Sequence, residues 1–464
     1  MDFNLASYVL GPGRARPDHP ALIVPGRAHL THADLLEAVE RRAGGFQARG
    51  LPPGARVLLR LGNEPDFPIT FLAACAAGLV PVPTSAQLTA SEIGAMADRV
   101  DPALVVSGPD IALPAGRPAV AAAELDADPL PFDDWVQDAP DRLGYIVFTS
   151  GSGGIPKAVA HAHRAVSARA SMREGWYGLR ADDRMMHAGA FNWTYTLGTG
   201  LLDPWSVGAT AIVPAPGTEA GALPALIAAE GATIFAAAPG IYRRMLRNDW
   251  PATPTLRHGL SAGERLPPAL RTQWQQATGL DLHEALGMTE CSTFVSGAPG
   301  RPAPEGASGY VQPGRSARVE GDRLVVGADD PGLMLGYWQD GAPVPVGPEG
   351  FDTGDRVSQR PDGAIVHEGR RDDLLNPGGH RVSPQEVEAA LADLPVEEIA
   401  VGCVTLEGGA TVLAAYYVGA PLDEDAANAH AAARLARYKQ PRLWLRRARL
   451  PRNANGKLIR DRLT

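Results

Sequence analysis

Tyr145-Ile146-Val147-Phe148 is followed directly by Thr149-Ser150-Gly151-Ser152-Gly153-Gly154-Ile155-Pro156-Lys157. The four apolar residues predict a buried strand, which delivers the chain to a loop rich in hydroxyl groups and glycine. Glycines let backbone N–H groups close on phosphate oxygens, the hydroxyls add donors, and Lys157 adds positive charge. It is not a Walker A loop, because Lys157 is followed by Ala158. The stretch predicts a phosphate cradle, although such a loop standing alone is equally typical of a surface turn.

Four further short segments follow this loop in a fixed order. They are Leu286-Gly287-Met288-Thr289-Glu290, Phe351-Asp352-Thr353-Gly354-Asp355, Gly369-Arg370-Arg371-Asp372-Asp373 and Pro451-Arg452-Asn453-Ala454-Asn455-Gly456-Lys457. The ordered set resembles the adenylate-forming superfamily, the acyl- and aryl-CoA synthetases with their carrier-loading and luciferase relatives. The resemblance runs from about Tyr145 to Leu463, and benzoate-type and medium-chain acyl-CoA ligases are the most similar branch. It implies ATP, Mg²⁺ and coenzyme A as cofactors.

Bulk properties restrict the class of protein. A chain of 464 residues is too long for one compact core, and its 45% hydrophobic and 20% charged residues are ordinary for a globular protein. The formal net charge of -9 argues against nucleic acid or an anionic membrane as a partner. Cys75, Cys291 and Cys403 show no paired spacing, which favours a reducing compartment. We therefore expect an untargeted cytoplasmic enzyme.

Apolar runs such as Val57-Leu58-Leu59 alternate with helical stretches such as Pro267 to Thr278. This alternation predicts an α/β fold in which stacked, mostly parallel sheets carry flanking helices. A β-rich subdomain is expected at about 298–368. The segment beginning at Ser383-Pro384-Gln385-Glu386 predicts a capped helix that opens a small α+β module. With the resemblance, the expected domains are 1–369 and a mobile 374–464, joined by a hinge at 370–373 that contains Asp372.

The resemblance also implies a role for individual residues in handling the nucleotide and coenzyme A. Phosphate contacts are expected from Thr149, Ser150, Gly151, Ser152, Gly154, Lys157 and Thr289, adenine contacts from Gly263 and Glu264, ribose contacts from Asp355, a further nucleotide contact from Arg370, and coenzyme A contacts from Gly379 and Arg381. A carboxylate beside a triphosphate is unfavourable unless a cation lies between them, so Glu290 is the expected Mg²⁺ ligand. Thr149 and Glu290 are expected to act in catalysis together with Lys457.

Lys457 is the strongest chemical candidate. A carboxylate that attacks the α-phosphate of ATP brings two anions together, and a mobile ammonium group near both stabilises the developing charge. Several arginines surround Lys457, so a basic solubilising tail is the alternative. The chain departs from the family pattern at Gly153, Ala158, Leu286 and Asn453. The missing hydroxyl at Gly153 is expected to weaken ATP binding several-fold, at about 1 kcal/mol for a neutral hydrogen bond.

The acid that would be activated is less well defined. The segment from Phe191 to Thr210 resembles the substrate pocket of the benzoate-type and medium-chain ligases, and the expected substrate contacts are Tyr195, Ala238, Gly287, Thr293 and Phe294. No aspartate opens this segment to hold an α-amino group, so the resemblance favours a compact aryl or short-to-medium acyl acid. Plain core packing is the alternative for each aromatic residue. A carrier-protein thiol as acceptor, a degenerate nucleotide or acyl binder, and a homodimer are also left open.

Overall fold

The computed structural model describes residues 2–149, 156–371, 375, 377, 382–406, 411–453 and 458–463. The chain forms two compact units. The first contains Met1–Ala317 and Val326–Phe351, and the second contains Arg318–Val325 and Asp352–Thr464. None of the helices in the described ranges combines the length and apolar composition that crossing a bilayer requires.

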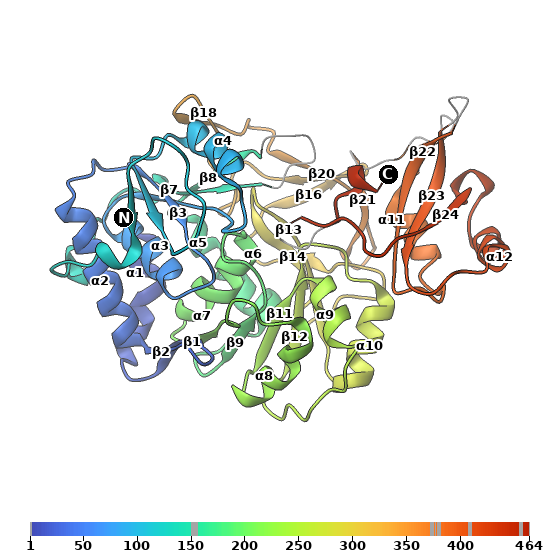
Figure 1. The fold of residues 1–464 in the computed structure, drawn as a ribbon, viewed down its shortest axis with the longest axis horizontal. Coiled ribbons are helices and arrows are strands. Elements are labelled where there is room, and N and C mark those ends of the chain that lie inside the picture. The colour runs from blue at the N-terminus through green and yellow to red at the C-terminus, as the bar shows by residue number, and fades with distance from the viewer. Residues whose placement is uncertain are drawn as a thin grey trace. The chain divides into compact units, whose positions relative to one another are not determined.

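A nine-stranded sheet organises the first unit (Figure 1). Its order is β15-β14-β13-β12-β11-β9-β10-β1-β2. The six strands from β13 to β1 are mutually parallel, whereas β2 pairs antiparallel with β1, β14 with β13, and β15 with β14. The strands are β1 (Pro20–Val24), β2 (Ala28–Thr31), β9 (Arg184–His187), β10 (Thr210–Ile212), β11 (Ile234–Ala237), β12 (His258–Ala262), β13 (Leu282–Met288), β14 (Ser292–Ser296) and β15 (Tyr310–Val311).

Both faces of this sheet are buried, which explains its nearly continuous apolar strands. One face packs against α8 (Leu223–Ala229), α9 (Pro239–Met245) and α10 (Pro268–Thr278), through side chains that include Phe235 and Trp274. The other face packs against Trp176, Tyr177 and Tyr195, which lie on η4 (Arg173–Tyr177) and α6 (Thr194–Leu197). Successive residues of a strand therefore point into two different apolar cores, one on each face of the sheet.

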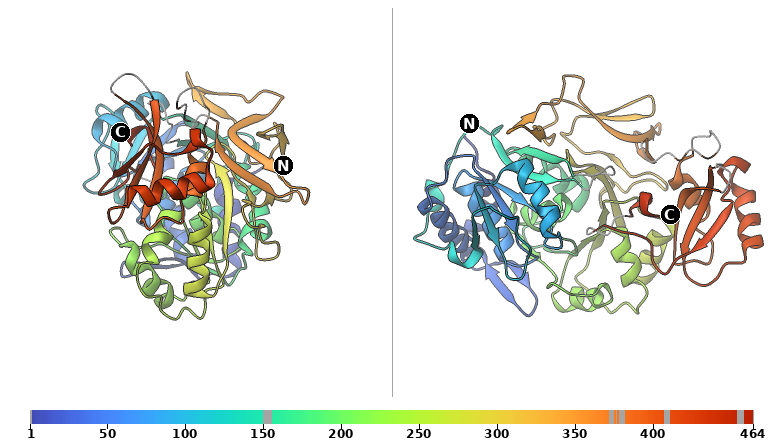
Figure 2. Two further views of the ribbon diagram at one scale, coloured as in Figure 1. Left: turned by 90° about the vertical axis from the view of Figure 1, so that its right-hand side faces the viewer. Right: turned by 45° about the horizontal axis from the view of Figure 1, so that its top comes forward.

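Two smaller sheets complete the first unit, and Figure 2 shows its blue N-terminal elements beside its green ones. One sheet has the order β4-β3-β5-β6 and is entirely parallel; the other has the order β19-β18-β8-β7 and is antiparallel throughout. The strands are β3 (Arg56–Arg60), β4 (Val80–Pro83), β5 (Leu104–Ser107), β6 (Ala119–Ala121), β7 (Leu143–Phe148), β8 (Ala158–Ala162), β18 (Gly336–Gln339) and β19 (Ala342–Val344). The remaining helices are α1 (Leu5–Leu10), α2 (His32–Ala48), α3 (Asp66–Ala76), α4 (Ala90–Val100), α5 (Ala165–Ala168) and α7 (Asp203–Trp205).

The second unit contains one sheet of four strands and one of three. The four-stranded sheet has the order β16-β17-β20-β21, with β16 (Ala317–Glu320), β17 (Arg323–Val326), β20 (Phe351–Gln359) and β21 (Ile365–Arg370). The three-stranded sheet has the order β22-β23-β24, with β22 (Glu398–Thr405), β23 (Thr411–Val418) and β24 (Leu443–Arg446). Its apolar core is shared with α11 (Pro384–Ala390) and α12 (Glu424–Arg434). The predicted α/β architecture with a smaller α+β module is confirmed.

Local sequence signals explain several element boundaries. Helix α10 begins after Pro267 and ends at Gly279, whose φ of 74° is left-handed and favours glycine. Helix α11 begins where the Ser383 hydroxyl accepts a bond from the Glu386 N–H at 3.4 Å. The apolar run at 145–148 forms the predicted buried strand as part of β7, which pairs antiparallel with β8 because the chain returns directly after the loop. The hinge at 370–373 remains a prediction.

Six histidines are buried in the first unit, and burial lowers the pKa of each of them, His32 included. Burial lowers the pKa of His163, His187 and His258 to about 3 and that of His161 and His283 to about 4. His163 Nδ1 accepts a bond from the Leu5 N–H at 3.0 Å, a contact that only the unprotonated nitrogen can make. Folding therefore requires these imidazoles to stay uncharged.

These histidines predict acid instability. Their pKa values in the unfolded chain are about 6.5, so the unfolded state binds more protons from there down to the folded pKa values, and stability falls as the pH falls through that window. At pH 5 the combined loss is on the order of 10 kcal/mol. We expect the thermal midpoint to drop by roughly 10 °C or more between pH 7 and pH 5, as scanning calorimetry would measure. The variant His258→Phe should flatten this dependence, whereas a midpoint unchanged over the range would contradict the account.

Candidate active site

The β7–β8 hairpin holds the predicted phosphate loop at its base. The Thr149 N–H donates to the Lys157 carbonyl at 2.9 Å, next to the ladder pair of Phe148 and Ala158. This bond closes the two ends of the loop, so Thr149 and Lys157 lie side by side. The expected phosphate contacts Ser150, Gly151, Ser152 and Gly154 lie outside the described residues.

Lys157 and Glu290 meet on opposite parts of one tyrosine. The Lys157 ammonium lies 4.8 Å from the centre of the Tyr337 ring, and the Tyr337 hydroxyl donates to Glu290 Oε1 at 2.8 Å. A cation over the ring face and an anion on the hydroxyl both match the charge distribution of a phenol. The structure thus brings together the expected phosphate lysine and the expected metal carboxylate.

The turn between β13 and β14 carries Glu290 and is bonded from several sides. The bonds run from His161 Nε2 to the Thr289 oxygen (2.8 Å), from the Met334 N–H to the Glu290 oxygen (2.7 Å), from Arg315 Nη2 to the Cys291 oxygen (2.8 Å), and from Arg315 Nη1 to the Thr293 oxygen (2.7 Å). The Arg315 guanidinium is itself paired with Asp330 at 2.8 Å, and both side chains are fully buried. A buried ion pair of this kind restricts the turn strongly, because breaking it leaves an uncompensated charge.

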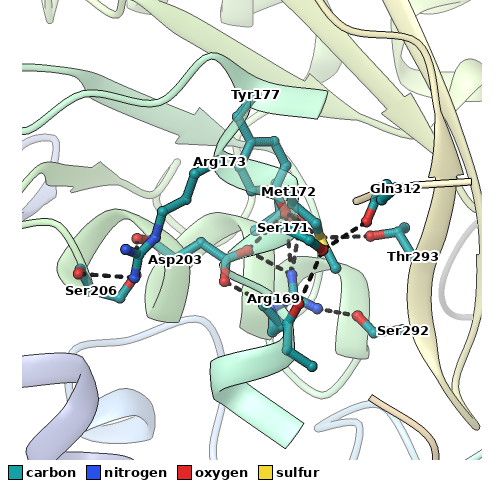
Figure 3. A network of polar contacts seen from close by, with 12 residues as sticks. Arg169, Ser171, Met172, Arg173, Tyr177, Asp203, Ser206, Ser292, Thr293 and Gln312 are labelled. Carbon is teal, nitrogen blue, oxygen red and sulfur yellow. Dashed lines mark hydrogen bonds and ion pairs between the residues drawn. The ribbon is translucent and has the colours of Figure 1, made fainter. Parts of the chain in front are cut away.

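A second buried arginine reaches the same turn (Figure 3). Arg169 donates to Asp203 through Nε at 2.8 Å and Nη2 at 2.6 Å, and Asp203 also accepts from the Tyr177 hydroxyl at 2.7 Å. Arg169 Nη1 bonds the hydroxyl of Ser292, whose φ of 61° is left-handed and costs a side-chain-bearing residue about 1 kcal/mol. Arg169 therefore supports a strained residue two positions after Glu290.

The residues around Glu290 fit a magnesium ion whose other ligands are water molecules and substrate phosphates. Among the described residues, no group of three or more side chains could hold a metal by itself. Mg²⁺ is commonly bound through one or two carboxylates together with substrate phosphates and water. Glu290 supplies one buried carboxylate near Lys157, and Thr289 precedes it in the turn. The predicted Mg²⁺ role of Glu290 is consistent with this arrangement and remains a prediction.

Aromatic side chains gather around the expected substrate residue Tyr195. Its ring stacks on Trp176 with 5.7 Å between centroids and meets Trp193 edge-on at 5.2 Å. Its hydroxyl donates to the Leu260 carbonyl at 3.2 Å, and burial raises its pKa well above the ordinary value, so the phenol remains neutral. Tyr195 therefore presents its ring, and not its hydroxyl, to the surrounding space.

The expected adenine residue Gly263 lies against the same aromatic group. A Cβ at Gly263 would come within 2.4 Å of the Trp193 ring, and the φ of 94° there is left-handed. Glycine is the residue that permits this close approach. The adjacent Glu264 is half-buried. The predicted adenine segment and the predicted substrate segment thus share Trp193 as a neighbour.

The remaining expected substrate residues lie on neighbouring elements. Gly287 pairs with Thr293 across β13 and β14, and a Cβ at Gly287 would come within 2.5 Å of the Thr293 backbone. Thr293 and Phe294 are both buried, and the Thr293 hydroxyl contacts the Met172 sulfur at 2.8 Å. Ala238 is half-buried and caps α9, directly after β11. Direct contact between these residues and a substrate remains a prediction.

In the second unit, two expected nucleotide residues lie side by side. Asp355 and Arg370 are ladder partners across β20 and β21, with 3.6 Å between Asp355 Oδ1 and Arg370 Nη1. His367 Nε2 lies 3.2 Å from the same Asp355 oxygen. The Arg370 guanidinium also donates to the Thr353 carbonyl at 3.1 Å. The expected residues Asp372, Gly379, Arg381 and Lys457 lie outside the described residues.

Sequence reasoning missed several residues that shape this site. Tyr337, Arg169 and Arg315 hold Glu290 or its turn, and His161 bonds the preceding carbonyl. None of them belongs to the motifs quoted above, and the hydroxyl that bonds Glu290 is 47 positions away along the chain. The aromatic pair Tyr337-Trp338 in the short strand β18 is the one feature of the sequence that could have drawn attention to Tyr337.

Comparison with known proteins places this chain in a known enzyme family. Residues 12–338 match the family of AMP-binding enzymes. The chain is 29% identical to the 3-hydroxybenzoate–CoA ligase of Aromatoleum sp. (strain CIB), over 99% of this chain and 96% of that protein. It is 31% identical to the benzoate–CoA ligase of Thauera aromatica, over 93% of this chain and 90% of that protein. A crystallised benzoate CoA ligase from Burkholderia xenovorans LB400 is similar in structure, with a TM-score of 0.85, 26% identity and 99% of both chains covered. The predicted resemblance is confirmed: the chain belongs to the AMP-binding enzyme family.

Proposed function

We propose that this protein is an AMP-forming ligase that joins an aryl carboxylic acid to coenzyme A. The observation that carries the proposal is the contact of Lys157 and Glu290 with opposite parts of Tyr337, beside the base of the hydroxyl- and glycine-rich loop. One positive and one negative group at this spacing suit a triphosphate with its metal ion. Membership of the AMP-binding enzymes supports the same reaction class.

The reaction proceeds in two balanced steps. In the first, a carboxylate oxygen of the acid attacks the α-phosphorus of ATP, the bond to the β-phosphate oxygen breaks, and pyrophosphate leaves. In the second, the coenzyme A thiolate attacks the carbonyl carbon of the acyl-adenylate, and AMP leaves with the pair of electrons of the broken C–O bond. The thiol proton passes to solvent.

The residues of the first unit bind and orient the nucleotide in this scheme. Lys157 offsets phosphate charge, while Glu290 is held by Tyr337 at a fixed place beside the loop. When Mg²⁺ is bound it neutralises charge on the phosphate oxygens. Asp355, in the second unit, has a carboxylate suited to accepting bonds from two ribose hydroxyls.

An aryl acid suits the composition of the expected pocket. Trp176, Trp193 and Tyr195 form an aromatic cluster, and Phe294 is buried on β14. Stacked and edge-on contacts with a further ring are favourable in such a cluster. The named relatives act on benzoate and 3-hydroxybenzoate, which supports the same substrate class for this chain. The proposed location is a reducing cytoplasm, which suits three free cysteines.

A panel of carboxylic acids tests the proposal. Pyrophosphate release from MgATP is expected with benzoate and its small ring-substituted derivatives, and thioester formation is expected when coenzyme A is added. Hexanoate and phenylalanine should be poor substrates, because the first lacks a ring and the second carries an α-amino group. Thioester formation only with a carrier-bound phosphopantetheine would reassign the acceptor. Binding of ATP without acid-dependent pyrophosphate release would show a nucleotide-binding protein and overturn the proposed reaction.

A further inference from the structure

Two buried polar side chains beside Tyr195 have no hydrogen-bond partner among the described residues. Both ring nitrogens of His187 and the hydroxyl of Thr196 are unbonded, although His187 is 1% exposed and Thr196 is 0% exposed. Leaving a buried polar group unpaired is unfavourable, because the group has lost its bonds to water. More than nine in ten buried polar groups in proteins are paired, so each exception calls for an explanation, such as a water molecule or a bound ligand.

The two side chains occupy one place in the fold. His187 is the last residue of β9, in register with Ala236 of β11, and the carboxyl ends of parallel strands are where open α/β sheets bind ligands. The His187 ring meets the Tyr195 ring edge-on, with 4.4 Å between centroids, and Thr196 follows Tyr195 in α6. Both polar groups pack against the same backbone position, because a Cβ at Gly189 would lie 2.2 Å from the Thr196 hydroxyl and 3.1 Å from His187 Nδ1.

The hydrogen-bonding capacity of the pair defines the group that would satisfy it. Burial keeps the pKa of His187 at about 3, so near pH 7 its ring is neutral, with one N–H donor and one nitrogen that accepts. The Thr196 hydroxyl both donates and accepts. A neutral hydroxyl on the ligand can donate to the unprotonated nitrogen and accept from the threonine at the same time. A charged substituent would be disfavoured in such a buried position.

Resting on the proposed function, we propose that His187 and Thr196 are specificity-determining residues that hydrogen-bond a hydroxyl substituent on the ring of the aryl acid. The aromatic cluster at Trp176, Trp193 and Tyr195 would bind the ring of the acid. His187 at the end of β9 and Thr196 on α6 would form hydrogen bonds with its hydroxyl substituent. The preferred substrates are therefore hydroxybenzoates, and unsubstituted benzoate leaves both polar groups unpaired.

Paired substrates and near-isosteric variants test this inference. For each ring position, kcat/KM for pyrophosphate release is compared between a hydroxybenzoate and the methylbenzoate that fills the same volume. The wild-type protein should prefer the hydroxyl at one position by about tenfold or more, the effect of one buried hydrogen bond pair. His187→Phe and Thr196→Val should each reduce that preference by lowering kcat/KM for the hydroxybenzoate more than for the methylbenzoate. His187→Gln, which keeps a donor and an acceptor, should retain part of the preference.

Two controls separate a specific role from a structural one. His283 is another buried histidine of the same sheet with an unbonded nitrogen, and His283→Phe should leave the hydroxyl preference intact. Calorimetric titration with the acids alone measures the binding preference without turnover. It therefore tests the inference even if no pyrophosphate is released and the proposed function is wrong. Equal binding of hydroxyl and methyl acids by the wild-type protein would overturn the inference. So would equal losses for both acids in His187→Phe and Thr196→Val, which would indicate packing or a trapped water.

Discussion

Replacing Glu290 with glutamine is expected to lower kcat for pyrophosphate release by about 100-fold or more. Glutamine has the same shape and can still accept the bond from the Tyr337 hydroxyl, so the turn that carries position 290 should keep its place. The substitution removes only the negative charge, and with it the attraction for Mg²⁺. The Mg²⁺ concentration that gives half-maximal rate should therefore rise, which a titration at saturating ATP would measure.

Tyr337→Phe is the matched control for Glu290→Gln. It keeps the ring beneath the Lys157 ammonium and removes only the hydroxyl that bonds Glu290. The loss of one hydrogen bond to a charged group is worth about 1.5–3 kcal/mol, so a decrease between roughly tenfold and 100-fold is expected. If Glu290→Gln retained the wild-type rate and Mg²⁺ dependence, the assignment of Glu290 to the metal would be wrong.

Replacing Lys457 with alanine is expected to separate the two half-reactions. Formation of the acyl-adenylate should fall by about 100-fold, because the ammonium stabilises charge that develops between the attacking carboxylate and the α-phosphate. Formation of the thioester from synthetic acyl-adenylate and coenzyme A should be largely spared, because that step does not bring the same two anions together. Pyrophosphate release and thioester formation, measured separately on one preparation, give the comparison.

The control for Lys457→Ala is a lysine of the same unit. Lys439 pairs with Glu386 at 2.5 Å, and Lys439→Ala removes one positive charge without touching the proposed chemistry. It should leave both half-reactions near the wild-type rates, since a largely exposed ion pair contributes about 1 kcal/mol or less. Equal loss of both half-reactions in Lys457→Ala would contradict the proposed role of Lys457 in forming the acyl-adenylate.

Structural features that depend on a few neighbouring residues could be predicted from the sequence. The boundaries of α10 and α11 follow from proline at the start, glycine at the end and a serine cap, all of which act within one turn of helix. The alternation of apolar strands and helices predicted the α/β class because both faces of a parallel sheet must be covered. The pairing of Asp355 with Arg370 was not predicted, because it depends on the register between β20 and β21.

Contacts between segments that are distant along the chain could not be predicted from the sequence. The turn at Glu290 is held by Arg169 from before β9, by Arg315 from beyond β15 and by Tyr337 of β18, and each contact depends on how sheets and loops stack. A single sequence carries no local signal for such pairs. The sequence also gives no sign of a special role for His187, because its register with Ala236 and its contact with Tyr195 depend on the tertiary structure.

The order of the short motifs in the sequence therefore predicted the family of this protein, because the phosphate loop and the motifs after it can be recognised from their own residues. Tertiary structure alone decided which groups support them and which polar atoms remain unpaired. The physical reason is range: turns, caps and strand periodicity arise from neighbours along the chain, whereas buried ion pairs and unpaired hydrogen-bonding groups exist only once distant segments have excluded water together.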